Sequence, residues 1–284
     1  MRRDEEKRDR NCGEVLKTGF KNPGTVRTKE AAHDLVTFYD GEIEKILISG
    51  IKVKYPSHKF IAEEDSSAFG EQALTSDPTW IIDPIDGTIN FVRKLHFVCI
   101  SVALSIEDDL KMSFLYNPTL NEFYTARKGQ GAFLNGEKIE TSKNEDMSRC
   151  VLAHEISLGT VSPFLPKYIE RAKAFLKRTI GLRAFGSAAL TLGYVAKGAI
   201  DAYNIEDLKP WDIAAGALIV QEAGGIVIDV SGGKYNIMKP NVIAAANQKL
   251  ADEIKEIVAE VDRILEQEGN TPKQLMEVAK KNKK

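Results

Sequence analysis

The chain has 284 residues and a formal net charge of -2, and 43% of its residues are hydrophobic and 28% charged. This composition is sufficient for a sizeable core, and a charge so close to neutral argues against nucleic acid as a main partner. No apolar run of about eighteen residues predicts a membrane helix, and the N-terminus MRRDEEKRDR lacks the apolar core of a secretory signal. With three widely spaced cysteines, these features predict a cytoplasmic protein with neither a zinc site nor a disulfide framework.

The first half of the chain is predicted to contain a charged arm, a helix and an antiparallel sheet. Residues 1–11 are expected to be a disordered arm, and apolar residues at helical spacing predict a helix over 42–51. Short apolar runs separated by turn residues predict strands. These strands are expected at 59–62, 79–82, 97–106, 110–116 and 122–126.

The second half alternates between helices and strands, which favours a layered α/β arrangement. The helices are expected at 190–196 and 211–223, and the strands at 199–205, 225–230 and 242–246. A single catalytic domain with two sub-layers is predicted over 12–247. A C-terminal helical extension is predicted over 248–284, with an amphipathic helix at 248–267 and a second helix that begins after Thr271.

Three places in the chain put carboxylates directly after an apolar strand or at the start of a helix. They are Glu63-Glu64-Asp65, the DPIDGT run that contains Asp83 and Asp86, and Asp212. Pro84 is expected to end the strand that precedes it and to turn the chain, so that Asp86 points to the same side as Asp83. Gathered carboxylates stay ionised only beside a cation, and oxygen ligands alone favour Mg²⁺, Mn²⁺ or Ca²⁺.

Each of these places also has a simpler explanation. A lone DxxD is commonly a turn, Glu63-Glu64-Asp65 could be a solvated loop, and Asp212 could cap a helix. No sequence rule brings the three together in space.

The runs that surround these carboxylates resemble one known family. They are AEED (62–65), WIIDPIDGTINF (80–91), GSAA (186–189) and WDIAAGALIVQEAGG (211–225), with further matches in KYPSHKFI (54–61) and YTARKGQGAFLNG (124–136). From about Gly13 to Asn247 the chain resembles the inositol monophosphatase family. The resemblance implies a layered α/β/α/β/α sandwich of the sugar-phosphatase type that forms a homodimer. It also implies two to three Mg²⁺ ions per site, inhibition by Li⁺, and a small phosphorylated polyol, inositol monophosphate, as substrate.

The same resemblance implies a set of metal ligands and catalytic residues. Glu63, Asp83 and the carbonyl of Ile85 correspond to ligands of one Mg²⁺, and Asp83, Asp86 and Asp212 to ligands of a second. Glu63 also corresponds to a ligand of a weaker third ion. Thr88 corresponds to the partner that, with Glu63, orients and deprotonates the attacking water. The implied reaction is in-line displacement by this water, with no covalent phosphoenzyme.

The resemblance also implies the substrate contacts. The N–H groups of Gly87 and Thr88 are expected to hold phosphate oxygens, and Lys29 corresponds to a family lysine near the metal site. The residues expected to contact the polyol are Asp86, Gly186, Ser187, Ala188, Glu206 and Asp212.

Two departures from the family pattern leave the substrate open. Ile89 stands where the family commonly has a second threonine, and Ile205 stands where it has a glutamate, with Glu206 one residue later. The alternatives are the same metal mechanism on a nucleotide 3′-phosphate, a sugar phosphate such as fructose bisphosphate or an inositol polyphosphate. A catalytically weak ligand-binding or regulatory module, or a Ca²⁺-stabilised structural protein, would belong to a different class.

Overall fold

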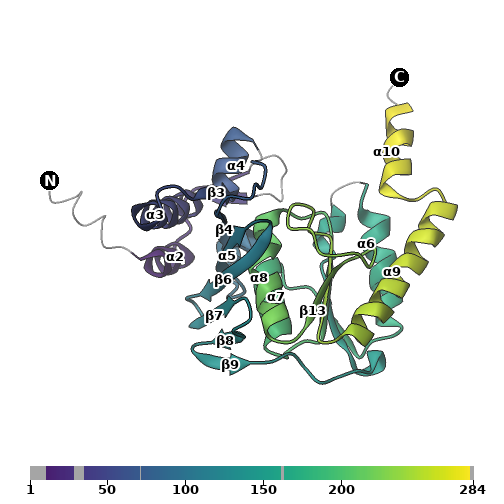
Figure 1. Cartoon of the computed structure of the whole chain (residues 1–284). Coiled ribbons are helices and arrows are strands. Elements are labelled where there is room, and N and C mark those ends of the chain that lie inside the picture. The colour runs from purple at the N-terminus through teal and green to yellow at the C-terminus, as the bar shows by residue number, and fades with distance from the viewer. Residues whose placement is uncertain (1–10, 29–34, 71, 161–162, 282–284) are drawn as a thin grey trace.

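The computed structural model describes residues 11–28, 35–70, 72–160 and 163–281, and these form five stacked layers (Figure 1). The predicted arm lies outside the described residues except for Asn11, and Lys29 also lies outside them. The Asn11 side chain accepts a hydrogen bond of 2.9 Å from the Glu14 N–H and caps helix α2 (Cys12–Lys21). None of the described helices has both the length and the hydropathy that a bilayer span requires.

The first sheet has seven strands in the order β3-β4-β5-β6-β7-β8-β9. Strands β3 and β4 pair in parallel and all later neighbours pair antiparallel, which confirms the antiparallel sheet predicted for the middle of the chain. The bounds are β3 Lys59–Ala62, β4 Thr79–Asp86, β5 Cys99–Ile106, β6 Asp109–Asn117, β7 Glu122–Arg127, β8 Ala132–Leu134 and β9 Glu137–Ile139.

Helices α2 and α3 (Phe38–Lys54) cover the outer face of this sheet. Their apolar residues and those of β3 to β5 form one buried cluster around Leu16, Ile43 and Phe91. A two-stranded ribbon contacts α3 and the short helix α5, and the short helix α4 contacts β3 and β4. The bounds are β1 Val26–Thr28, β2 Leu35–Thr37, α4 Glu63–Phe69 and α5 Thr88–Arg93.

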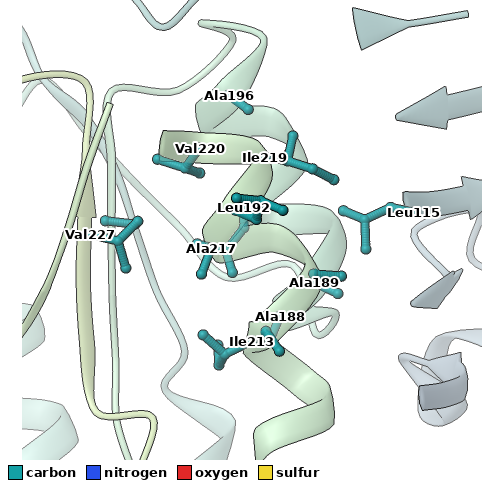
Figure 2. Packing of buried hydrophobic residues seen from close by; sticks show 14 of the residues in the cluster. Leu115, Ala188, Ala189, Leu192, Ala196, Ile213, Ala217, Ile219, Val220 and Val227 are labelled. Carbon is teal, nitrogen blue, oxygen red and sulfur yellow. The ribbon is translucent and has the colours of Figure 1, made fainter. Parts of the chain in front are cut away.

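Helices α7 (Ala188–Ala196) and α8 (Pro210–Glu222) form the central layer between the two sheets. Figure 2 shows Leu192 between the two helices, with Leu115 of the first sheet on one side and Val227 of the second sheet on the other. Gly216 of α8 lets the two helices approach each other closely, because a β-carbon there would lie 2.5 Å from the Cβ of Leu192 on α7. Because both helices bury nearly their whole surface, they read as apolar runs, and the two predicted helices are confirmed.

The second sheet is mixed, with the order β11-β10-β12-β14-β13, and helices α6 and α9 cover its outer face. The α9 residues Leu250, Ile254 and Val258 are buried against this sheet, so the helix predicted as an extension supplies part of the fifth layer. The layered α/β/α/β/α sandwich is therefore confirmed. The bounds are β10 Val151–His154, α6 Leu165–Leu176, β11 Gly181–Arg183, β12 Ala202–Ile205, β13 Ile226–Asp229, β14 Val242–Ala245, α9 Gln248–Gln267 and α10 Pro272–Lys281, with short 3-10 helices at Met147–Arg149 and Ser157–Thr160.

Candidate metal centre

Three aspartates from two parts of the chain meet where the first sheet joins the central helices. Asp83 and Asp86 come from the end of β4, and Asp212 comes from the first turn of α8. Each offers a carboxylate oxygen, and these oxygens all lie within 4.8 Å of one another. The predicted convergence of the DPIDGT run with Asp212 is therefore present in the fold.

The local geometry of β4 brings its two aspartates to the same place. The pairing with β5 is regular up to Asp83, shifts its register, and resumes where Asp86 pairs with Cys99. The prediction that Pro84 ends the strand is wrong. Pro84 lies in this irregular stretch, where its missing N–H removes no ladder hydrogen bond. The Ile85 N–H donates to Asp83 Oδ1 at 2.9 Å and fixes that carboxylate.

Asp86 also caps the N-terminus of helix α7. Its Oδ2 accepts from the Ser187 hydroxyl and from the Ala189 and Leu190 N–H groups, at 2.9 and 3.4 Å for the two amides. Its Oδ1 accepts from the Ala188 N–H at 3.2 Å. The contact between Asp86 and the GSAA stretch is therefore structural, since these bonds satisfy the amides that the first helical turn leaves open.

Asp212 belongs both to the capping box of helix α8 and to the carboxylate cluster. Its Oδ2 accepts a hydrogen bond of 2.7 Å from the N–H of Lys209, which is the N-cap residue, so the simpler prediction that Asp212 is itself the N-cap is wrong. The carboxylate nevertheless lies with Asp83 and Asp86, so the capping bond orients it toward them.

Glu63 joins the cluster from helix α4. Its carboxylate lies close enough to Asp83 to help raise the pKa of that aspartate, and the alternative of a solvated loop at 63–65 is wrong because α4 begins at Glu63. The buried Glu44 of α3 holds that helix start, since its carboxylate accepts from the Glu64 and Asp65 N–H groups at 2.8 and 2.9 Å. Sequence reasoning missed Glu44, although it is a charged residue on the apolar stripe of its helix.

The electrostatics of the cluster favour the binding of a cation. Burial, followed by the charges of Glu63, Asp86 and Asp212, raises the pKa of Asp83 well above its usual value. Burial and the charge of Asp86 likewise raise the pKa of Asp212. Burial raises the pKa of Asp86 to about 6, although its hydrogen bonds to α7 oppose that shift. A bound cation would remove this penalty on ionisation.

Gly87 and Thr88 form the turn that follows the aspartates. The Thr88 hydroxyl donates to the Ile85 carbonyl at 3.1 Å. Gly87 has φ +87°, and a β-carbon there would lie 3.0 Å from the Phe97 carbonyl oxygen and 3.1 Å from that of Gly186. The glycine therefore lets the 186–188 loop approach the turn, a role that the sequence did not indicate.

Replacing Gly87 with alanine is expected to lower the free energy of unfolding by more than the roughly 1–2 kcal/mol that a β-carbon costs in left-handed backbone. The added methyl group would press on two backbone carbonyls, which have little freedom to move. Phosphate release should also fall, because the turn between Asp86 and Thr88 would shift. Denaturant unfolding and a phosphate assay measure the two effects.

Gly136 supplies the matched control. It has φ +86° in the turn between β8 and β9, and a β-carbon there would meet nothing within 4 Å. Gly136→Ala should cost only the backbone contribution and leave phosphate release unchanged. Equal stability losses in the two variants would mean that the loop contact is not the reason for glycine at 87.

Two further polar residues that sequence reasoning missed hold the 185–187 loop. Glu155 follows strand β10, and its Oε1 accepts from the Phe185 and Gly186 N–H groups at 2.8 and 3.0 Å. The Asn90 amide donates to the Phe97 and Phe185 carbonyls at 2.8 and 2.7 Å. Glu155 carried the signal used for Asp83, a carboxylate directly after an apolar strand, whereas Asn90 carried none.

The positions that depart from the family pattern have distinct surroundings. Ile89 is 45% exposed on α5, whereas Ile205 is fully buried in the main core cluster. The Glu206 carboxylate forms ion pairs with Arg171 and, at 3.6 Å, with Lys167. Glu206 therefore turns toward helix α6, and its expected contact with the polyol remains a prediction.

The donor set fits a hard divalent cation. Carboxylate oxygens from four residues gather in a mostly buried place, and their ionisation is unfavourable unless positive charge joins them. A layered α/β sandwich with such a site, beside a turn at the start of a short helix, defines the class of divalent-cation-dependent phosphatases. Residues 4–263 match the model of the inositol monophosphatase family. The chain belongs to this family, and it is a phosphoric monoester hydrolase.

Individual relatives agree with this assignment. Inositol monophosphatase 1 of Homo sapiens is 42% identical over 250 residues, which are 87% of this chain and 90% of the human protein. The structure of an IMPase from Thermotoga maritima is 35% identical, covers 89% of this chain and 94% of its own, and has a TM-score of 0.80. A staphylococcal IMPase-II bound to 2′AMP is 28% identical, with 90% and 92% coverage and a TM-score of 0.75.

Proposed function

We propose that this chain hydrolyses inositol monophosphates to inositol and phosphate, with Mg²⁺ held by the carboxylate cluster. The observation that carries the proposal is the convergence of Asp83, Asp86 and Asp212 within 4.8 Å, beside Glu63. Family membership supports the same reaction.

The proposed ligand sets follow the family resemblance. Glu63, Asp83 and the Ile85 carbonyl would hold one ion, and Asp83, Asp86 and Asp212 a second, with Glu63 also available to a third. The Ile85 carbonyl already accepts from Thr88, and its second lone pair leaves room for a cation. Bound Mg²⁺ supplies positive charge that favours ionisation of a water and stabilises charge on the leaving oxygen.

The chain's own groups orient the reactants. Glu63 and Thr88 hold the attacking water, and Glu63 takes its proton. The N–H groups of Gly87 and Thr88 bind phosphate oxygens. The fixed position of Thr88 against the Ile85 carbonyl supports this assignment, because it keeps the hydroxyl next to a proposed metal ligand.

The polyol is proposed to lie against Asp86, Asp212 and the loop of Gly186, Ser187 and Ala188, with Glu206 as a further contact. The ion pair between Glu206 and Arg171 leaves that carboxylate less available for a hydroxyl group. A nucleotide monoester is the second candidate substrate, because a staphylococcal relative has been solved with 2′AMP bound as well as with inositol monophosphate bound.

Three further properties are proposed. Inhibition by Li⁺ and assembly as a homodimer come from the family resemblance alone, and a cytoplasmic location comes from the sequence features. The three cysteines, Cys12, Cys99 and Cys150, are free, which is compatible with a reducing compartment.

Purified protein is expected to release phosphate from inositol 1-phosphate only when Mg²⁺ is present. Parallel assays carry a nucleotide 2′-phosphate, a nucleotide 3′-phosphate and fructose 1,6-bisphosphate. Preference for a nucleotide would keep the metal chemistry and change the substrate. Failure to release phosphate from any ester would favour a ligand-binding module, with Ile89→Thr as the first reversion to assay.

A further inference from the structure

A buried arginine links helix α9 to the segment that precedes Asp212. Arg171 lies on α6 and is 1% exposed, so its permanent charge requires partners. Two carboxylates from different elements supply them. Arg171 Nη2 donates to both oxygens of Asp262 on α9 at 2.8 Å, Nε donates to Asp262 Oδ1 at 3.2 Å, and Nη1 pairs with Glu206. Helices α6 and α9 lie side by side on the outer face of the second sheet (Figure 1).

The segment 206–209 joins strand β12 to helix α8, and α6 holds its first two residues. The Tyr168 hydroxyl lies 3.0 Å from the Glu206 carbonyl and 3.1 Å from Asp207 Oδ2, and Asp207 also pairs with Lys167. Asp207 has φ +61°, a conformation that persists only where neighbouring contacts impose it.

The last residue of the segment is tied to the metal centre. The Lys209 N–H donates to Asp212 Oδ2 at 2.7 Å. The short connection is thus anchored to α6 at one end and to a carboxylate of the cluster at the other. If Glu206 moved, the segment 206–209 would move with it and would displace Asp212.

We propose that Asp262 and Arg171 are positioning residues that set the place of Asp212, and with it the affinity for the divalent cation. This inference rests on the proposed function only in taking Mg²⁺ as the ligand. It gives helix α9 a role in the active site although no residue of that helix belongs to the cluster.

Two ion pairs of helix α9 differ in whether they contact the 206–209 segment. Glu260 pairs with Arg178 at 2.8 Å, both side chains are more than a third exposed, and neither holds the 206–209 segment. Asp262 is itself 47% exposed, and the apolar face of α9 fixes the helix on the sheet through Leu250, Ile254, Ile257, Val258, Val261 and Leu265. Asp262→Asn should therefore leave α9 in place.

The test is calorimetric titration of the full chain with Mg²⁺ after removal of metal. Asp262→Asn should raise the dissociation constant about 5- to 10-fold, somewhat less than the 10- to 100-fold seen when a direct partner of a metal ligand is lost. The Mg²⁺ concentration for half-maximal phosphate release should rise by the same factor, with kcat at saturating Mg²⁺ nearly unchanged. Asp262→Glu should restore most of the affinity, and Glu260→Gln should match the wild type.

Asp207→Asn gives a second route, since asparagine tolerates the left-handed backbone while the pair with Lys167 is lost, and it should also weaken Mg²⁺ binding. Wild-type affinity in both Asp262→Asn and Asp207→Asn, even with a lowered melting temperature, would overturn the proposal. A wild-type protein that bound no Mg²⁺ would overturn it too. If the wild type bound Mg²⁺ but released no phosphate, only the proposed function would fall.

Discussion

Asp83→Asn is expected to reduce phosphate release at least about 10²- to 10³-fold, the loss seen when one preorganised electrostatic group is removed from an active site. Asp83 is the carboxylate shared by both proposed ligand sets, and it lies between Glu63 and the other two aspartates. Asparagine keeps the shape and one oxygen but removes the negative charge that draws the cation. The measurement is the initial rate of phosphate release at saturating Mg²⁺.

The same variant should be more stable than the wild type when metal is absent. The buried charge of Asp83 is opposed by burial and by three neighbouring carboxylates, and the substitution removes that repulsion. Asp77→Asn is the control, because Asp77 precedes the same strand at its other end and pairs with Lys59 on the surface. It should keep full activity and leave the stability nearly unchanged, because exposed ion pairs contribute little. Near-normal turnover by Asp83→Asn would show that the reaction does not depend on this cluster.

Sequence periodicity predicted the antiparallel sheet and the layered α/β half of the chain, whereas the five-layer sandwich was predicted by the family resemblance. The apolar alternation of β5 to β7 and the continuous apolar runs of α7 and α8 reflect how much of each surface is buried. Short elements such as α5 and β9 were missed because a single turn or three residues carry too little pattern. The strand end at Pro84 was wrong because a bulge can place proline inside a strand without the loss of a hydrogen bond.

Residue spacing alone predicted less of the metal centre than of the fold. Asp83 and Asp86 are neighbours in sequence, but Asp212 joins them only because α8 packs between the sheets with its first turn at the end of β4. The family resemblance, and not residue spacing, predicted that Asp212 would join the other two aspartates. Neither spacing nor resemblance indicated that Glu206 would pair with Arg171, since this pair depends on how α6 packs.

Without metal, the protein is expected to lose stability as the pH rises from 6.5 to 8.5. Burial raises the pKa values of Asp83 and Asp212 well above the normal range and those of Asp40 and Glu44 to about 7. In the unfolded chain these groups titrate near pH 4. Within the window the folded state therefore binds more protons than the unfolded state, and the free energy of unfolding decreases with pH.

The window from pH 6.5 to 8.5 lies above the pH range in which a buried histidine makes the stability rise with pH. Burial lowers the pKa of His154 to about 4, so this group makes stability rise with pH only up to the unfolded histidine value of about 6.5. Above that pH the buried carboxylates determine how the free energy of unfolding changes with pH. A combined loss of several kcal/mol would lower the melting temperature by roughly 10 °C.

Saturating Mg²⁺ should reverse this trend, because protons compete with the cation for the same carboxylates. The stabilisation produced by Mg²⁺ should therefore be larger at pH 8.5 than at pH 6.5, and thermal melts with chelator or with Mg²⁺ measure it. Asp83→Asn lacks one of the titrating groups, so both its pH dependence without metal and its response to Mg²⁺ should be smaller. A metal-free protein whose melting temperature stayed constant across the window would mean that the cluster is already ionised and compensated by charges within the protein, and the cation would then not be needed to hold these carboxylates together.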